Sequence, residues 1–323
     1  MEILDRKGNP DLAEIYVARL REDPLSLVEF VDAVDPRYPR EEKWVITVST
    51  QFGCPVKCLM CDAGGFYRGN LTADEILSEI DAIVRKRAPS GVIGSGKFKI
   101  HFARMGEPAL NPAVLEVLGR LPSCYRAPGL IACIPTIAPA SASGWFEELL
   151  RIKRPHYMDG HFQLQFSINS TDEDARDGMM PVAKWSLHEI ADYGARWYSR
   201  GDRRVVLNFA LAEGIEVDPR AIARHFSPQI FMIKLTPVNP TKTALRSGFR
   251  TVLSGAAPDR AAGLVGELEG RGFGCVVSIG DDREIAIGSN CGQAASMVLR
   301  REAVRRTTAR EVAAGGHEPL TGS

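Results

Sequence analysis

The chain has 323 residues, of which 45% are hydrophobic, so it is long enough to bury a substantial core. It contains seven cysteines, and an odd number with three packed into eight residues favours metal binding in a reducing compartment over a disulfide framework. No apolar run reaches the roughly 18 residues that a membrane span needs, and the charged N-terminus is unlike a secretory signal. We therefore expect a cytoplasmic protein with no membrane partner.

The balance of charge bears on the substrate. The 40 Lys and Arg residues equal the 40 Asp and Glu residues, so the formal net charge is zero. Proteins that grip folded RNA neutralise several phosphates and usually show an excess of basic surface. Basic stretches at 196–204 and 300–310 are interpreted as solvated surface and tail. Charge thus favours a small or peptidic substrate without excluding RNA.

Short β-rich runs alternate with helical patterns along the chain, which is typical of successive β-α units in a parallel sheet. Several of these runs are apolar almost throughout, as strands covered on both faces should be. Six strands are predicted, at 45–49, 98–103, 129–134, 162–168, 205–210 and 230–235, followed by a late strand at 275–279. Six units are too few for a closed eight-fold barrel. The expected fold is therefore α/β, an open, partial (β/α)6 barrel with ligands at the carboxyl ends of its strands.

The clearest predicted helix begins after Thr72, because Thr72 and Glu75 form a capping box and apolar residues then recur on one face. A second helix is predicted with Asn111 as its cap and Pro112 in its first turn. Further helical patterns cover 185–198, 218–225 and 258–271. Three segments are expected: a short N-terminal extension at 1–43, the partial barrel at 44–299, and a flexible tail at 300–323.

A loop with three cysteines follows the first predicted strand. Cys54, Cys58 and Cys61 stand at the spacing CxxxCxxC, where each thiolate can take one iron of a 4Fe-4S cube and leave the fourth iron open to a small molecule. Zinc is the rival metal, but a structural zinc site normally has four ligands and no fourth Cys or His lies nearby in sequence. A metal-binding module without catalysis is the alternative from a different class.

With this loop after its first strand, the chain resembles the radical S-adenosylmethionine (SAM) superfamily. The resemblance implies a reduced cluster that cleaves SAM to a 5′-deoxyadenosyl radical, and a reducing partner such as flavodoxin or ferredoxin. One departure is Met60, where the superfamily usually has an aromatic residue before the third cysteine.

Several short segments also resemble, in order, the class A radical SAM methyltransferases of the RlmN and Cfr type, which methylate adenine carbons in ribosomal and transfer RNA. They lie at 49–54, 105–108, 110–111, 166–169, 176–181, 236–240 and 290–293. The resemblance implies that Gly106 and Glu107 receive the amine of SAM and that Ser167, Asn169 and Asn239 contact SAM. Turn or cap roles remain the alternative for these five residues.

The resemblance also implies two catalytic residues. Cys291 would be methylated by one SAM, and a second SAM would supply the radical that activates this methyl group for addition to an electron-poor sp2 carbon; thiolate nucleophilicity is the physical basis of the first step. Glu29 matches the segment that carries the family's candidate proton acceptor, and a solvated glutamate on a helix face is the alternative.

Two features depart from the family. A second essential cysteine of the family, which resolves the covalent adduct with substrate by forming a disulfide, is here Thr47. Either resolution proceeds differently, for instance with an external thiol, or no such adduct forms. Only about 43 residues precede the first predicted strand, where the RNA methylases carry an accessory domain.

These observations predict a radical SAM C-methyltransferase that acts on a small molecule rather than on RNA. An RNA adenine methyltransferase is the first alternative. The second is a radical SAM enzyme that rearranges or oxidises its substrate without methyl transfer.

Overall fold

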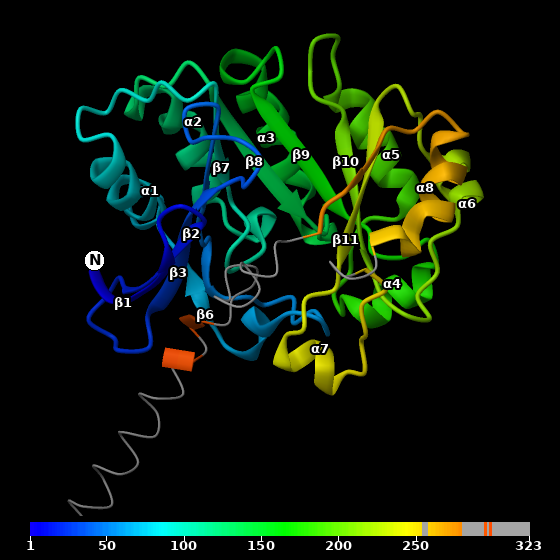
Figure 1. Ribbon diagram of the computed structural model, residues 1–323, viewed down its shortest axis with the longest axis horizontal. Coiled ribbons are helices and arrows are strands. Elements are labelled where there is room, and N and C mark those ends of the chain that lie inside the picture. The colour runs from blue at the N-terminus through cyan, green and yellow to red at the C-terminus, as the bar shows by residue number, and fades with distance from the viewer. Residues whose placement is uncertain (254–257, 280–293, 296, 299–323) are drawn as a thin grey trace, which may run out of the picture.

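In the computed structural model, ten strands form one continuous sheet (Figure 1). The structure describes residues 1–253, 258–279, 294–295 and 297–298. The strands follow one another across the sheet in the order β1 (Glu2–Asn9), β2 (Ala13–Arg19), β3 (Leu27–Val34), β4 (Lys43–Thr47), β7 (Lys97–His101), β8 (Leu130–Thr136), β9 (Phe162–Ser167), β10 (Val205–Leu211), β11 (Phe231–Pro237) and β12 (Cys275–Val277).

From β4 onward the strands of this sheet are parallel, which confirms the predicted α/β fold. The six predicted strands are β4 and β7 to β11, and the late strand is β12. β1 and β12 are the two edges of the sheet, so the described strands leave it open, as expected for a partial barrel.

The N-terminal segment 1–43 continues this sheet. β1, β2 and β3 pair antiparallel to one another, and β3 pairs antiparallel to β4, with Val31 opposite Thr47. Sequence reasoning did not predict these strands. Residues of β2 and β3 are buried on both faces, so they show no alternation of apolar and polar side chains.

The helices connect the parallel strands, and most of them lie along the outer side of the sheet (Figure 1). They are α1 (Ala73–Arg87), α2 (Ala113–Cys124), α3 (Ser143–His156), α4 (Glu173–Met179), α5 (Leu187–Trp197), α6 (Pro219–His225), α7 (Lys242–Arg246) and α8 (Ala262–Glu269). None of the helices in the described part of the chain is long and apolar enough to span a membrane.

Local sequence signals set the starts of the first two helices. The hydroxyl of Thr72 accepts a hydrogen bond from the N–H of Glu75 and the Glu75 carboxylate accepts one from the N–H of Thr72, which confirms the predicted capping box. The Asn111 side chain accepts from the N–H of Ala113, as a helix cap does. The same side chain donates to two backbone carbonyls, at Thr50 and Leu71, and so ties α2 to the loop after β4.

The two faces of the parallel strands differ in character. In β4 and β7, Trp44, Ile46, Phe98 and Ile100 are fully buried and pack in the core with the apolar face of α1. The alternate residues of the same strands are half-buried or exposed and face the inner side of the sheet. This inner side carries the polar side chains from which the candidate site is built.

Candidate active site

The cysteine loop is held at both ends by a short hairpin. β5 (Gln51–Gly53) pairs antiparallel with β6 (Tyr67–Asn70) and places residues 54–66 between them. Gly53 has φ +78°, and a Cβ there would lie 1.4 Å from the carbonyl oxygen of Phe66. A Cβ on Gly64 would lie 2.6 Å from the Cα of Lys57. The loop thus packs on itself so closely that only glycine fits at these two positions.

The three thiols of this loop lie within electrostatic range of one another. Burial raises the pKa of the Cys54 thiol to about 12, and the neighbouring Cys61 adds to the shift. Burial also raises the pKa of Cys58 and of Cys61, and both other thiols contribute at Cys58. Desolvated thiols of this kind become thiolates only when a strongly positive group binds them.

A cluster suits this donor set better than a single ion. A 4Fe-4S cube offers each of three thiolates its own iron, whereas a structural single-metal site normally has four ligands. The chemistry of the three thiols is therefore compatible with the cluster that sequence reasoning predicted.

A cavity of about 270 Å³ adjoins the cysteine loop at the carboxyl ends of β9, β10 and β11. Cys58 and Cys61 line it on one side. Ser167, Asn169 and Asn239, the three residues predicted to contact SAM, line it as well. Residues far apart in sequence thus meet where the resemblance places SAM.

Asn169 combines this position with a structural role. It has φ +64°, its side-chain oxygen accepts a hydrogen bond from the N–H of Ala210 at 3.1 Å, and its amide nitrogen contacts the sulphur of Met180 at 3.4 Å. These bonds fix the turn after β9, so Asn169 has the turn role that sequence analysis gave as the alternative to contact with SAM. They also hold the side chain at the cavity wall.

Asn208 and Thr236 line the same cavity and were missed by sequence reasoning. The amide of Asn208 contacts the Thr236 hydroxyl at 3.5 Å, whereas its buried oxygen has no hydrogen-bond partner within the described ranges. Such an acceptor costs free energy unless a ligand donates to it. The available signal was a single polar residue inside the apolar run Val205–Leu211.

Gly106 and Glu107 form the turn after β7. Gly106 has φ +101°, and a Cβ there would lie 2.5 Å from the hydroxyl oxygen of Thr50 and 2.8 Å from the side chain of Gln51. The N–H of Glu107 donates to the Gln51 side chain at 2.9 Å. The turn therefore depends on glycine and packs directly against the segment that leads into the cysteine loop.

The Glu107 carboxylate is occupied by protein donors. It accepts hydrogen bonds from the Thr136 hydroxyl at 2.5 Å, from the N–H of Ile137 at 3.0 Å and from the N–H of Ala109 at 3.1 Å. Burial raises its pKa to about 7. Glu107 acts electrostatically on Cys54 and Cys58, and its partner Ile137 lines the cavity, but Glu107 itself is absent from the cavity wall. The structure thus shows the cap role that sequence reasoning left open.

Glu29 lies in β3 and is fully buried, so the alternative of a solvated helix-face glutamate is wrong. One carboxylate oxygen lies 2.5 Å from Nε of Arg104, and the other accepts a hydrogen bond from the N–H of Ala295 at 2.8 Å. Glu29 also acts electrostatically on Cys61. It therefore joins β3 to the cysteine loop region and to the C-terminal segment.

Cys291 lies outside the described residues. The nearby Ala294 and Ala295 are described and buried, and they pack in one apolar cluster that Cys54 and Cys61 border. Thr47, the residue in place of the family's second cysteine, is the last residue of β4 and is half-buried. It stands opposite His101 of β7 on the inner face of the sheet.

Comparisons with known proteins come from sequence and from structure. No family model matches the chain. A relative from Frankia alni named "Probable dual-specificity RNA methyltransferase RlmN" is 29% identical over 278 residues, covering 82% of this chain and 62% of its own length. Relatives of the same name from Saccharopolyspora erythraea and Thermus thermophilus are 26% and 27% identical, cover 82% and 81% of this chain, and are themselves covered to 71% and 70%.

A solved structure has the same fold. The crystal structure of a radical SAM methyltransferase from Sphaerobacter thermophilus superposes with a TM-score of 0.70 at 21% identity, covering 91% of this chain and 81% of the other. The solved structure thus confirms the predicted fold, and the relatives confirm that the chain resembles the RlmN-type methyltransferases.

The same relatives overturn one expectation. Sequence reasoning favoured a small molecule over RNA as the substrate, but the relatives reported above are named RNA methyltransferases. The argument from charge failed because net charge is a sum over the whole molecule. It does not report the potential at one site, where a few basic side chains suffice for contact with phosphates.

Proposed function

We propose that the chain is a radical SAM methyltransferase that adds a methyl group to an adenine carbon of RNA. The cavity beside the cysteine loop carries this proposal, since Cys58, Cys61 and the three predicted SAM contacts line one space. The names of the relatives support RNA as the substrate. Because the chain spans only 62% of the Frankia alni relative, activity and substrate are both part of the proposal.

Cys54, Cys58 and Cys61 would hold the 4Fe-4S cluster, which when bound supplies the electron that cleaves SAM. Ser167, Asn169 and Asn239 would orient SAM by hydrogen bonds. The buried oxygen of Asn208 would accept a hydrogen bond from the same ligand, which would remove the cost of its missing partner.

Cys291 would carry the methyl group to the adenine. The burial of Ala294 and Ala295 beside Cys54 and Cys61 supports this assignment, because it anchors the chain close after Cys291 next to the cysteine loop. Glu29 would accept the proton released from the methylated carbon. Its position beside the cysteine loop, where it acts electrostatically on Cys61, supports this role.

The test measures methyl transfer to Cys291 and to RNA. The protein is reconstituted anaerobically with iron and sulfide, reduced, and incubated with methyl-labelled SAM and an unmodified RNA transcript, and peptides and nucleosides are then analysed by mass spectrometry. We expect label on Cys291 and in C-methyladenosine, and loss of both in Cys291→Ala. Cys124→Ala is the matched control, since Cys124 is exposed at the end of α2 and should not affect either product.

Other outcomes separate the alternatives. Reductive cleavage of SAM without label on Cys291 or RNA would replace the proposal with a radical reaction that does not transfer methyl groups. A labelled Cys291 with unlabelled RNA would retain the methyl carrier and exclude the tested RNA. Thr47 makes a further outcome informative: a protein–RNA adduct that is released only by an added thiol would show that resolution occurs without a second cysteine.

A further inference from the structure

The inner face of the sheet carries a second group of functional side chains, one layer from the SAM cavity toward the amino ends of the strands. Lys234 precedes Thr236 of the cavity wall by two residues on β11, so both point to the inner side. Lys99 of β7 and Lys43 of β4 also face inward, at half-buried positions that alternate with core residues. Three lysines from three strands thus converge on one interior space.

These lysines lie close enough to repel one another. Burial lowers the pKa of Lys99, and the nearby Lys43 lowers it further; burial likewise lowers the pKa of Lys234, and Lys99 and Lys43 add to the effect. Burial also lowers the pKa of His101, on the same side of β7. Within the described ranges, no carboxylate forms an ion pair with Lys99 or Lys234.

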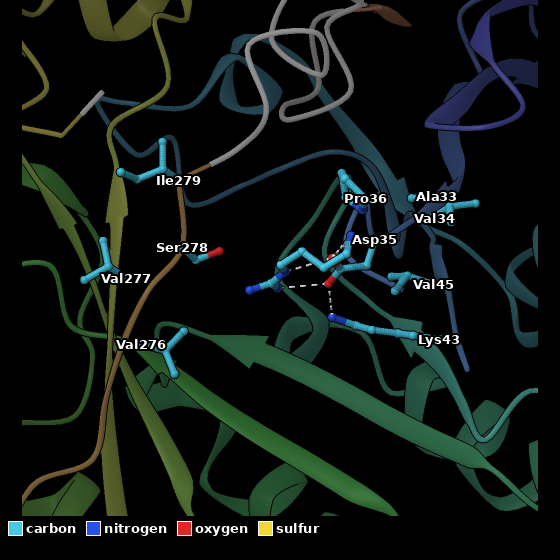
Figure 2. Close-up of a pocket in the computed structure, with 11 residues that line it drawn as sticks. Ala33, Val34, Asp35, Pro36, Lys43, Val45, Val276, Val277, Ser278 and Ile279 are labelled. Atoms are coloured by element: carbon cyan, nitrogen blue, oxygen red, sulfur yellow. Dashed lines mark hydrogen bonds and ion pairs between the residues drawn. The ribbon is translucent and has the colours of Figure 1, made fainter. Parts of the chain in front are cut away.

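A cavity of about 440 Å³ opens beside this group. Figure 2 shows Val276, Val277, Ser278 and Ile279 on one side of it. Asp35 of the β3–β4 connection and Lys43, the first residue of β4, lie on the other side. Asp35 receives hydrogen bonds from both Lys43 and Arg37.

The strand register directs the two remaining lysines toward this cavity. Val45 and Val276 are part of its wall. Val45 stands opposite Lys99 in the pairing of β4 with β7, and Val276 stands opposite Lys234 in the pairing of β11 with β12. Residues paired in this way project to the same face of a sheet. Lys99 and Lys234 therefore lie on the same side of the sheet as this cavity, next to residues of its wall and not in the wall itself.

Asp35 offsets only part of the positive charge at this cavity. Its carboxylate is already shared by Arg37 and Lys43, so the ammonium groups of Lys99 and Lys234 remain uncompensated among the described residues. Two desolvated like charges cost free energy in the folded protein unless an anion binds between them. Lysine is a common ligand of phosphate, and a phosphate group offers several oxygens to ammonium groups that approach from different sides.

We propose that the interior space around Lys99 and Lys234, which this cavity adjoins at Lys43, is a binding site for a phosphate group. The site is distinct from the SAM cavity, which lies at the carboxyl ends of the strands and has a different set of lining residues. A free nucleotide or polyphosphate is one source of the phosphate, and the backbone of an RNA is the other. Binding of phosphate does not depend on methyl transfer.

The experiment is calorimetric titration of the full-length protein with inorganic pyrophosphate at low salt. We expect one pyrophosphate per chain, and an affinity that falls by at least about tenfold in Lys99→Met/Lys234→Met. Lys7→Met is the matched control, because Lys7 lies on β1 at the far edge of the sheet. This variant should bind pyrophosphate with the affinity of the wild type. Lys99→Arg/Lys234→Arg keeps both charges and should retain binding.

Melting temperatures give a readout that does not rely on titration. Without ligand, the double methionine variant should melt no lower than the wild type, since it loses two repelling charges, and pyrophosphate should raise the melting temperature of the wild type alone. Competition identifies the source: an RNA transcript that displaces pyrophosphate points to backbone phosphate, and one that does not points to a free phosphate compound. Absence of pyrophosphate binding, or equal binding by the double methionine variant, would overturn the proposal.

Discussion

Individual residues of the candidate site are constrained by backbone geometry as much as by chemistry. Gly106 illustrates this, because the resemblance assigned it to SAM, whereas the structure shows why no other residue fits. Its φ of +101° lies in the region that glycine alone adopts readily, and the side chains of Thr50 and Gln51 fill the space of a Cβ. The position thus maintains the contact between the turn after β7 and the start of the cysteine loop.

Gly106→Ala should destabilise the protein by about 1–3 kcal/mol and reduce SAM cleavage, because the turn must move away from Thr50 and Gln51. Urea unfolding and the yield of 5′-deoxyadenosine measure the two effects. Gly119→Ala is the control: Gly119 lies within α2 with open space around its Cβ position, and helix propensity predicts a gain of about 0.5–1 kcal/mol. Equal stability of the two variants would refute the packing argument.

At the level of elements, buried polar side chains join strands and helices that sequence reasoning could only place separately. Glu79 of α1 is fully buried, and its carboxylate accepts a hydrogen bond from the N–H of Ser49, just after β4, at 2.8 Å. The hydroxyl of Ser49 donates to the carbonyl of Glu29 in β3 at 2.6 Å. One chain of contacts thus connects α1, the entry to the cysteine loop and β3.

Glu79 should make stability depend on pH. Burial raises its pKa well above the ordinary value of 4.5, so folding favours the protonated acid. The protonated side chain makes its full contribution to the free energy of unfolding below about pH 4.5. This contribution declines as the pH rises toward the folded-state pKa, because ionisation then stabilises the unfolded chain. Glu79→Gln removes this dependence.

Urea unfolding at about pH 5 and about pH 8 tests the role of Glu79. Relative to Glu79→Gln, the free energy of unfolding of the wild type should fall by on the order of 1 kcal/mol or more between these two pH values. Glu116→Gln, at an exposed site on α2, should follow the wild type. Parallel pH profiles for the wild type and Glu79→Gln would mean that Glu79 is ionised in the folded protein.

The whole molecule combines a neutral overall charge with strongly uneven local charge. Its 40 basic and 40 acidic side chains cancel, yet Lys43, Lys99 and Lys234 gather inside the sheet. Many exposed arginines are paired with nearby carboxylates, such as Arg196 with Glu147. Other exposed basic side chains of the described residues, such as Lys57 and Arg246, take part in no ion pair.

These unpaired basic side chains predict that RNA binding depends on salt. We expect the affinity for an RNA transcript to fall by roughly twentyfold or more between about 50 and about 200 mM salt, as for a protein that neutralises at least three phosphates. Fluorescence anisotropy over a salt series measures the slope. An affinity that stays constant over the series would show that no phosphates are contacted and would contradict the prediction.

The sequence by itself determined the parallel strands, the first helix caps and the cysteine loop, because these depend on local periodicity, local hydrogen bonds and close spacing. It also indicated Ser167, Asn169 and Asn239, through the resemblance of short segments around them. Periodicity could not reveal β1 to β3, since β2 and β3 are covered on both faces and lack an alternating pattern.

Only the tertiary structure decided which distant residues meet. Sequence reasoning could not distinguish an exposed Glu29 from one buried against Arg104, nor single out Asn208 as part of the wall of the cavity beside the cysteine loop. It also could not bring Lys99 and Lys234 together, because 135 positions separate them and each alone resembles an ordinary surface lysine. Their meeting is a consequence of strand order and register, which place side chains from separate strands on one inner face and so create sites that no local pattern contains.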